Sequence, residues 1–160
     1  MPDPHHAPTG LTFTIERPDS EAARNLISEL DADLLERYPK QFIHGLHPED
    51  IDDPGLVFVV ARDGVMPVGC GALRRIDSQT AEVKRMFVVP GLRGRGFARQ
   101  ILGFLEGTAR KAGYATLRLE TGARQHEAVG LYRSVGYSEI ACYGEYVGNP
   151  FSVCFEKGLD

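Results

Sequence analysis

The feature that most constrains the fold is an apolar strand that runs through a glycine-bearing loop into a long amphipathic helix. The strand covers residues 81–89, Pro90-Gly91 ends it, and the helix is predicted over residues 94–112. One face of that helix carries Phe97, Ile101, Leu105, Ala109 and Ala112. A second apolar strand follows at 115–121 after Gly113, a typical helix-ending residue. The segment therefore predicts a β-α-β unit, whose two strands lie parallel with a right-handed crossover.

The rest of the pattern predicts an α+β protein rather than a doubly wound sheet. Asp63-Gly64 indicates a tight hairpin between strands 56–61 and 67–74. Capped by Asp19 or Ser20, a helix with apolar residues at a 3.6 period runs toward Pro39. The remaining predicted elements are a strand at 12–17, a helical turn at 48–50, a helix at 125–135 and a strand at 152–156. The order gives an antiparallel meander, one parallel crossover and a closing strand.

Length and composition predict one domain over residues 11–160, preceded by a flexible tail at 1–10. His5 and His6 lie in that tail without a third ligand nearby, so we expect no metal. The longest apolar stretch, 56–61, is far shorter than a membrane span, so we expect no membrane partner. The start lacks the pattern of a secretory signal, and the three cysteines lack C-x-x-C spacing. We therefore expect free thiols and a cytoplasmic location.

Charge is distributed unevenly along the chain. The net charge of −4 gives no support to nucleic-acid binding as the main task. Residues 19–53 hold ten acidic against three basic side chains, whereas residues 84–111 hold seven basic against one acidic. One interpretation is a basic end that attracts a polyanion and an acidic end that attracts a cationic ligand. The alternative, equally open at this point, is two ordinary solvated faces.

The loop between the strand and the helix predicts an anion site. A helix N-terminus presents unpaired N–H groups and a positive dipole end, and Gly94 and Gly96 let a phosphate approach the backbone. A Walker loop is excluded because no Gly-Lys-Ser/Thr occurs, and a dinucleotide fingerprint fails because its third glycine falls on Arg99. An RNA-binding Arg-Gly repeat is disfavoured because the motif occurs once. A plain connector turn is the remaining alternative.

Three motifs, which follow one another along the chain with the expected spacing, resemble those of the GNAT superfamily of N-acetyltransferases. They are R-x-x-G-x-A at Arg93, Gly96 and Ala98, the strand 82–90, and A-x-x-L-Y-x-x-x-G-[FY] at 128–137. The ending 149–157 is similar to small single-domain bacterial members of unassigned acceptor, and the likeness spans about Gly69 to Lys157. The resemblance implies a mixed, mostly antiparallel central sheet, in which the fourth and fifth strands are parallel and splay apart, with helices on both faces.

The same resemblance implies that acetyl-CoA is a co-substrate. Its pantetheine arm would bind the backbone of the strand, at Met86, Phe87 and Val88. Its pyrophosphate would lie on the loop and first helical turn, at Arg93, Gly94, Arg95, Gly96, Phe97, Ala98 and Arg99. Gln125 occupies a position where the family more often has Asn, so a cofactor contact is expected there on a longer arm.

Two residues match catalytic positions of the family. Tyr132 matches the general acid that protonates the leaving thiolate, although 128, 131, 132 and 135 also form an apolar face typical of a core aromatic. Glu82 matches the carboxylate base of histone-acetylating members, with a charge paired to Arg85 or Lys84 as the alternative. Weaker candidates for the pocket are Glu120, Tyr143, Glu145 and Tyr146, and for the acceptor side Tyr38, His44 and His47. Cys142 and Cys154 are interpreted as packing residues, since direct transfer needs no acyl-cysteine.

The sequence thus predicts an acetyl-CoA dependent N-acetyltransferase that transfers acetyl directly to a primary amine of a small molecule or peptide. The alternative is a non-catalytic module that binds or senses acyl-CoA, which would need neither Tyr132 nor Glu82. The acidic segment 19–53 favours a cationic acceptor such as a polyamine, an aminoglycoside or a lysine side chain. Dimers are common in the superfamily, so a homodimer is a further expectation by resemblance.

Overall fold

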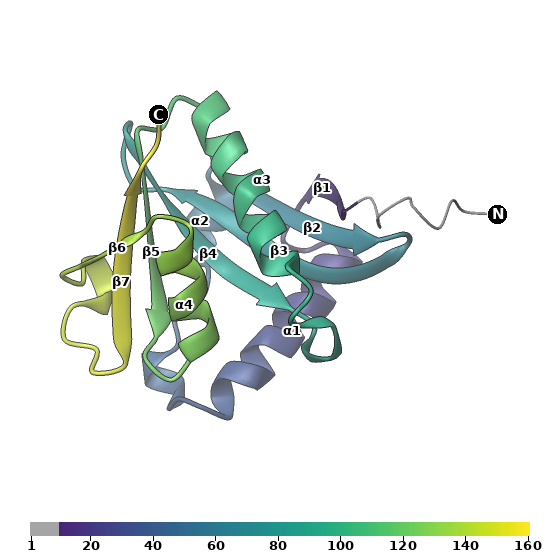
Figure 1. The fold of residues 1–160 in the computed structure, drawn as a ribbon, viewed down its shortest axis with the longest axis horizontal. Coiled ribbons are helices and arrows are strands. Elements are labelled where there is room, and N and C mark those ends of the chain that lie inside the picture. Colours follow the sequence, from purple (N-terminus) through teal and green to yellow (C-terminus); the bar gives the residue numbers. More distant parts are fainter. Residues whose placement is uncertain (1–9) are drawn as a thin grey trace.

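The computed structural model describes residues 10–160, and in that part of the chain seven strands form one mixed sheet (Figure 1). The predicted tail, with His5 and His6, lies outside the described residues apart from Gly10. Across the sheet the strand order is β1-β2-β3-β4-β5-β7-β6, and only β4 and β5 pair in parallel. This arrangement confirms the predicted α+β class and the mostly antiparallel sheet.

The helices and strands follow the predicted order closely. The strands are β1 (Thr12–Glu16), β2 (Val57–Asp63), β3 (Met66–Arg75), β4 (Thr80–Val88), β5 (Thr116–Gly122), β6 (Ser138–Ile140) and β7 (Ser152–Gly158). The helices are α1 (Glu21–Leu35), α2 (Pro48–Asp52), α3 (Phe97–Lys111) and α4 (His126–Ser134). Ser20 caps α1 by accepting a hydrogen bond from the Ala23 amide, as its position before the apolar period predicts.

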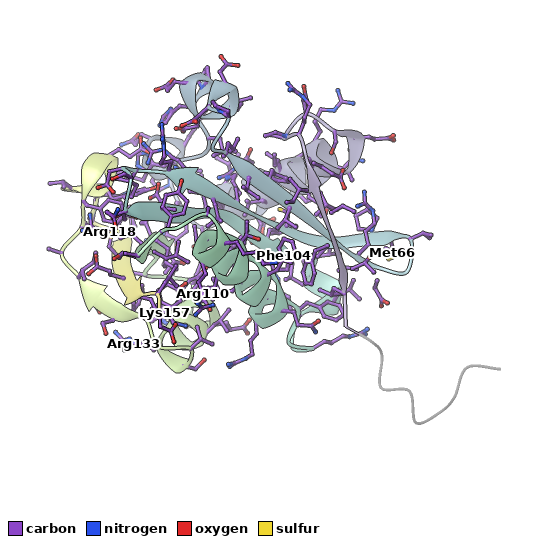
Figure 2. The ribbon with its side chains drawn as sticks, turned by 90° about the horizontal axis from the view of Figure 1, so that it is seen from above. Met66, Phe104, Arg110, Arg118, Arg133 and Lys157 are labelled. Atoms are coloured by element: carbon purple, nitrogen blue, oxygen red, sulfur yellow. The ribbon has the colours of Figure 1, made fainter. Side chains whose placement is uncertain are left out.

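Helices cover both faces of the sheet (Figure 1). On one face, α3 contributes Ile101, Leu102 and Leu105 to a core that also contains Tyr132 of α4. On the other face, α1 packs Leu26 and Leu30 against a second cluster from β2, β3 and β4. In the view of Figure 2, Phe104 of α3 lies near β1, where its ring stacks on Phe13 at 4.7 Å. Each helix therefore buries one apolar stripe, the arrangement that its 3.6-residue period predicts.

The fourth and fifth strands splay apart as predicted. Their parallel pairing runs from Thr80 opposite Thr116 to Val83 opposite Leu119 and then ends. Beyond that point the edge of β4 that faces β5 has no strand partner within the described chain. The β3–β4 ladder contains an irregularity at the same level, where Arg85 has a φ of 56°. A bulge there increases the local twist and turns β4 away from β5.

Two local differences from the predicted pattern have clear causes. Helix α3 begins at Phe97 rather than at residue 94, because Gly94 and Gly96 have φ of 82° and 80°, outside the helical region. The short strand β6 was not predicted; it pairs only with β7, over three residues. Such a brief edge strand gives almost no period in the sequence. Within residues 10–160, none of the helices has the length and hydropathy that crossing a bilayer requires.

Candidate active site

The loop before α3 leaves a run of backbone amides without hydrogen-bond partners within the described chain. The amides of residues 94–99 make no hydrogen bond within the described chain, and the Gly96 N-cap position has no side-chain cap. A Cβ added at either Gly94 or Gly96 would meet nothing within 4 Å, so both glycines are there for their positive φ and not for lack of space. The loop thus presents a run of free donors at the positive end of a helix.

The arginines around this loop differ in whether their guanidinium groups already have hydrogen-bond partners. Arg93 donates to the Val88 carbonyl at 3.0 Å and pairs with Asp33 of α1 at 3.4 Å, so it ties the loop to the body of the protein. Arg99 donates to the Ser134 hydroxyl at 3.0 Å, which links α3 to α4. Arg95 is exposed. The predicted loop residues therefore lie together, with Arg93 in a structural role that leaves the backbone amides as the main donors.

A cavity opens where β4 and β5 diverge. Its walls come from α1, β4, β5, α4 and the loops around residues 38–44 and 146–151. Its apolar and aromatic lining is Leu30, Leu34, Tyr38, Phe42, Ile43, Val83, Met86, Ala128, Tyr132, Tyr146 and Phe151. Its charged and titratable lining is His44, Lys84, Arg85 and Glu120. Of the predicted pantetheine residues Met86 lines the cavity, whereas Phe87 and Val88 are buried in the two cores.

Tyr132 belongs both to the core and to the cavity. Its ring packs on Tyr137 at 5.8 Å and on Phe155 at 6.1 Å, while its hydroxyl makes no hydrogen bond within residues 10–160. Burial raises the pKa of Tyr132, and the nearby charge of Glu120 raises it further. The phenol therefore stays protonated at neutral pH and is available as a proton donor. The interpretation of Tyr132 as a core aromatic is confirmed, and its role as the general acid stays a prediction.

Glu120 is the carboxylate that faces this cavity. It lies in β5, one residue beyond the last β4–β5 pair, and the Ser152 hydroxyl donates to it at 2.6 Å. Burial raises the pKa of Glu120, and the Ser152 hydrogen bond opposes that shift. A carboxylate with a raised pKa binds a proton more readily than a solvated one. Sequence reasoning ranked Glu120 below Glu82 because the direction of its side chain becomes visible only once the strands have splayed.

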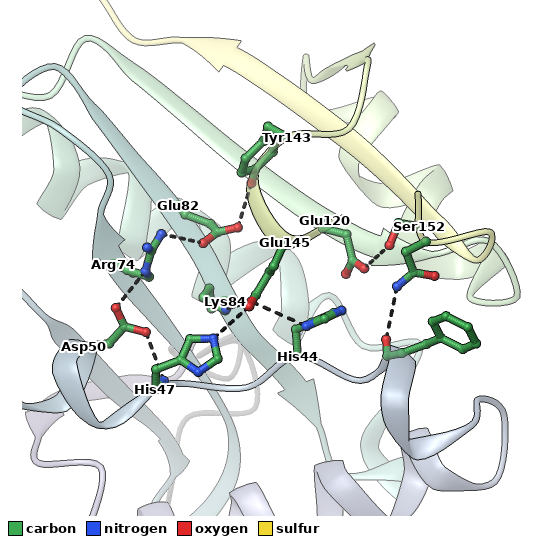
Figure 3. A network of polar contacts seen from close by, with 12 residues as sticks. His44, His47, Asp50, Arg74, Glu82, Lys84, Glu120, Tyr143, Glu145 and Ser152 are labelled. Carbon is green, nitrogen blue, oxygen red and sulfur yellow. Dashed lines mark hydrogen bonds and ion pairs between the residues drawn. The ribbon is translucent and has the colours of Figure 1, made fainter. Parts of the chain in front are cut away.

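Glu82 lies in a different environment. Its side chain is 2% exposed and does not line the cavity; it pairs with Arg74 at 3.2 Å and accepts a hydrogen bond from the Tyr143 hydroxyl at 2.7 Å. Arg74 also holds Asp50 of α2 at 2.8 Å, so the two carboxylates share one guanidinium (Figure 3). The partner of Glu82 is thus neither Arg85 nor Lys84. This arrangement resembles a buried structural ion pair.

A second polar cluster centres on Glu145 (Figure 3). His47 Nε2 lies 2.8 Å from its carboxylate, and His44 Nδ1 and Lys84 Nζ each lie 3.6 Å from it. Burial raises the pKa of Glu145, but the His47 hydrogen bond and the charges of Lys84 and the histidines together lower it. His44 lines the cavity and His47 does not. No local signal links His47 to a residue 98 positions away, so the sequence could not predict this carboxylate partner.

Gln125 and Tyr38 fix the end of β5. The Gln125 side-chain carbonyl accepts the Gly122 amide at 3.1 Å at the start of α4. The Tyr38 hydroxyl accepts the Arg124 amide at 3.1 Å, and its ring fills the place that a Cβ at Gly122 would need. Both residues also line the cavity, so the loop after α1 forms one of its walls.

Two acidic residues of segment 19–53 form ion pairs with the basic segment 84–111 inside the molecule. Asp31 of α1 pairs with Arg85 at 2.7 Å, and Asp33 pairs with Arg93. The acidic and basic segments therefore bind each other across the fold, and the carboxylates at 31 and 33 already have partners. A cationic ligand is not required to balance them.

Comparison with known proteins identifies the family. Residues 21–137 match the model of the Acetyltransferase (GNAT) family. The chain belongs to this family. This GNAT chain is 40% identical to an "IAA acetyltransferase" of Azospirillum brasilense over 151 residues, which cover 93% of this chain and 98% of that protein. It also resembles the structure of a putative acyl-CoA N-acyltransferase from Klebsiella pneumoniae, with 32% identity and a TM-score of 0.79 over 94% and 98% of the two chains.

The fold is shared with more distant GNAT structures as well. An Elizabethkingia anophelis GNAT acetyltransferase with acetyl-CoA bound has a TM-score of 0.69 and 16% identity, over 94% of this chain and 99% of that one. Within residues 10–160 of this GNAT chain, no group of three or more His, Cys, Asp or Glu side chains is arranged to hold a metal ion. Its three cysteines are free thiols, as predicted.

Proposed function

We propose that this GNAT chain transfers the acetyl group of acetyl-CoA directly to a primary amine. The observation that carries the proposal is that a carboxylate with a raised pKa, Glu120, and a protonated phenol, Tyr132, face one cavity at the strand splay. Direct transfer needs one group to take a proton and another to give one. The family and the free amides of residues 94–99 support acetyl-CoA as the donor.

The diphosphate of the donor binds at the start of α3, and its pantetheine arm follows the unpaired edge of β4 toward the cavity. In that position the arm completes the hydrogen bonds that β5 makes only as far as Leu119. The thioester then reaches the cavity beside Met86 and Tyr132. Fixing donor and acceptor in one cavity removes much of the entropic cost of their encounter.

The chemical step balances with the side chains at hand. Glu120 accepts the proton of the acceptor ammonium, directly or through water, and the free amine attacks the thioester carbonyl. A backbone N–H of β4 near Phe87 or Val88 stabilises the oxyanion. The C–N bond forms, the C–S bond breaks, and Tyr132 gives its proton to the leaving thiolate, whose ordinary pKa is about 8.5. The second proton on the attacking nitrogen then passes, directly or through water, to the Tyr132 phenolate, which leaves a neutral amide and restores the phenol. Glu82 does not contact the reactants in this scheme. It fixes the positions of Arg74, through an ion pair, and of Tyr143, whose hydroxyl donates a hydrogen bond to it.

The test is release of free CoA thiol from acetyl-CoA in the presence of a panel of primary amines, combined with calorimetric titration of CoA. Turnover with at least one amine, together with saturable CoA binding, supports the proposal. Tight CoA binding without turnover for any amine would show the alternative, a module that senses acyl-CoA. Absence of CoA binding would contradict both.

A further inference from the structure

The strongest unexplained feature of the cavity is the ammonium group of Lys84. Its side chain is 4% exposed, lines the cavity from β4, and makes no hydrogen bond within residues 10–160. Its nearest counter-charge is Glu145 at 3.6 Å, and its ammonium lies 5.7 Å from the centre of the Tyr146 ring. A buried ammonium with unfilled donors is costly unless an anion completes its environment. Lys84 therefore has donors available to a ligand that enters the cavity.

The carboxylates that pair with Lys84 and Arg85 do not line the cavity. Glu145 does not line the cavity and is shared with His47 and His44, and Asp31, the partner of Arg85, does not line it either. The cavity wall thus presents the ammonium of Lys84, whereas the guanidinium of Arg85 pairs with Asp31, which lines a second cavity beside α1 and not this one. Glu120 is the one carboxylate among the described lining residues. A dication such as a polyamine would meet one carboxylate and one ammonium on this wall, so its second positive charge would have no partner there.

Apolar and aromatic side chains occupy the rest of the wall. Tyr38 and Phe151 pack edge to face at 5.6 Å, and Phe42 packs on Phe151 at 5.3 Å. Leu30 and Leu34 of α1 add aliphatic surface. An apolar cavity with a few convergent polar groups is typical of a small-molecule site. The polar groups here are a proton acceptor, Glu120, and an anion-binding donor, Lys84.

We propose that the acceptor is an amine that also carries a carboxylate, of the α-amino-acid class, with an apolar or aromatic side chain. Its carboxylate binds Lys84 Nζ, its amine faces Glu120, and its side chain contacts the Tyr38, Phe42 and Phe151 surface. This inference rests on the proposed function and replaces the cationic acceptor that the charge gradient favours, because Asp31 and Asp33 of α1 already pair with Arg85 and Arg93 and the described cavity lining holds one carboxylate, Glu120.

The test compares phenylalanine with phenylalaninamide and phenethylamine as acceptors, with acetyl-CoA as donor. The amide has nearly the same shape and a less basic amine, so its amine is more readily deprotonated than that of the amino acid. We expect kcat/KM to be at least tenfold higher for phenylalanine, which corresponds to about 1.4 kcal/mol. Equal or higher kcat/KM for the amide or for phenethylamine overturns the inference.

Variants at Lys84 test whether this side chain causes the preference for phenylalanine over the two acceptors without a carboxylate. Lys84→Met removes the preference for phenylalanine, mainly through KM, and Lys84→Arg retains it. Lys111→Met, at an exposed lysine that ends α3, is the matched control and leaves the preference unchanged. An unchanged preference in Lys84→Met overturns the inference. Thermal melting of each variant shows whether it is folded, and the wild-type comparison stands even if Lys84→Met does not fold.

Two further outcomes separate this inference from the proposed function. If succinyl-CoA is a better donor than acetyl-CoA and Lys84→Met reverses that order, Lys84 binds the acyl chain of the donor and the inference is wrong. If simple amines are acetylated with no preference for a carboxylate, the inference fails while the proposed function stands. If CoA does not bind at all, the proposed function itself fails.

Discussion

The carboxylate of Glu120 in β5 and the phenol of Tyr132 in α4 face the same cavity, and the charge of the first raises the pKa of the second. Burial raises the pKa of Tyr132 even more, so the phenol keeps its proton while Glu120 is ionised, which is the protonation state that direct acetyl transfer needs at its start. The two residues lie on elements joined by the Gln125 turn. A change in that turn would therefore move both groups relative to the thioester.

Tyr132→Phe removes the proton donor and keeps the ring that packs on Tyr137 and Phe155. We expect kcat to fall by about 10²- to 10⁴-fold, the usual contribution of a general acid, with CoA affinity unchanged. Steady-state kinetics and CoA titration measure the two effects. Tyr114→Phe, which removes a hydroxyl from a partly buried tyrosine just after α3, is the control and should be neutral. Full turnover in Tyr132→Phe would exclude the acid role.

Glu120→Gln and Glu82→Gln together decide which carboxylate is the base. We expect the first to lower kcat/KM by about 10²-fold or more and the second by only a few-fold, because Glu82 points toward Arg74 and away from the cavity. Wild-type kcat/KM should rise with pH through the pKa of Glu120, at a pH above the ordinary carboxyl range. That inflection should be lost in Glu120→Gln. The opposite ranking of the two variants would return the base role to Glu82.

Thermal unfolding of Glu120→Gln provides an independent check. Burial raises the pKa of Glu120 in the folded chain, so the folded state binds more protons than the unfolded state between the two pKa values. Its contribution to stability is therefore present below the unfolded pKa, about 4.3, and lost as pH rises through the folded pKa. We expect Glu120→Gln to melt at or above the wild-type temperature at pH 8. A marked drop would indicate that its lost activity reflects unfolding.

Gly96→Ala tests the anion loop. Gly96 has a φ of 80° and open space around it, so the substitution acts through backbone strain of about 1–2 kcal/mol. We expect the Kd for CoA, measured by calorimetry, to rise about fivefold or more. Gly103→Ala in the exposed interior of α3 adds the same methyl group at a helical φ and should stabilise the fold by about 0.5–1 kcal/mol without changing the Kd. Equal affinities of both variants would remove the loop from the CoA site.

Glu106→Ala tests a buried pair remote from the cavity. Glu106 of α3 pairs with Lys157 of β7 at 3.0 Å and accepts a hydrogen bond from the Tyr137 hydroxyl at 2.8 Å. Removal leaves the buried Tyr137 hydroxyl and the partly buried Lys157 ammonium without their partner, so the free energy of unfolding should fall by about 1–3 kcal/mol in denaturant titration. Arg133→Ala breaks an exposed pair with Glu139 and should cost less than about 1 kcal/mol. Similar costs for both variants would show that burial does not strengthen the first pair.

The sequence by itself determined the order of the main elements, the glycine turn before α3 and the position of Tyr132. These features are local, because residues close together in the sequence determine each of them. They are the 3.6-residue period, the cap by Ser20 and the positive φ at Gly94 and Gly96. Tyr132 was predictable for a related reason, since its helix carries a compact motif within ten residues. The brief strand β6 lacks such a signal and was missed.

Only the tertiary structure decided which charged side chains face the cavity. Glu82 lies in the paired part of β4, opposite Arg118, and forms an ion pair with Arg74, whereas Glu120 lies just beyond the last β4–β5 pair, where the strands diverge, and faces the cavity. The pairing of Asp31 with Arg85, 54 residues apart, likewise removes charges that the sequence offers to a ligand. Contacts of this range depend on how strands twist and separate, and nothing in the residues nearby along the chain encodes them.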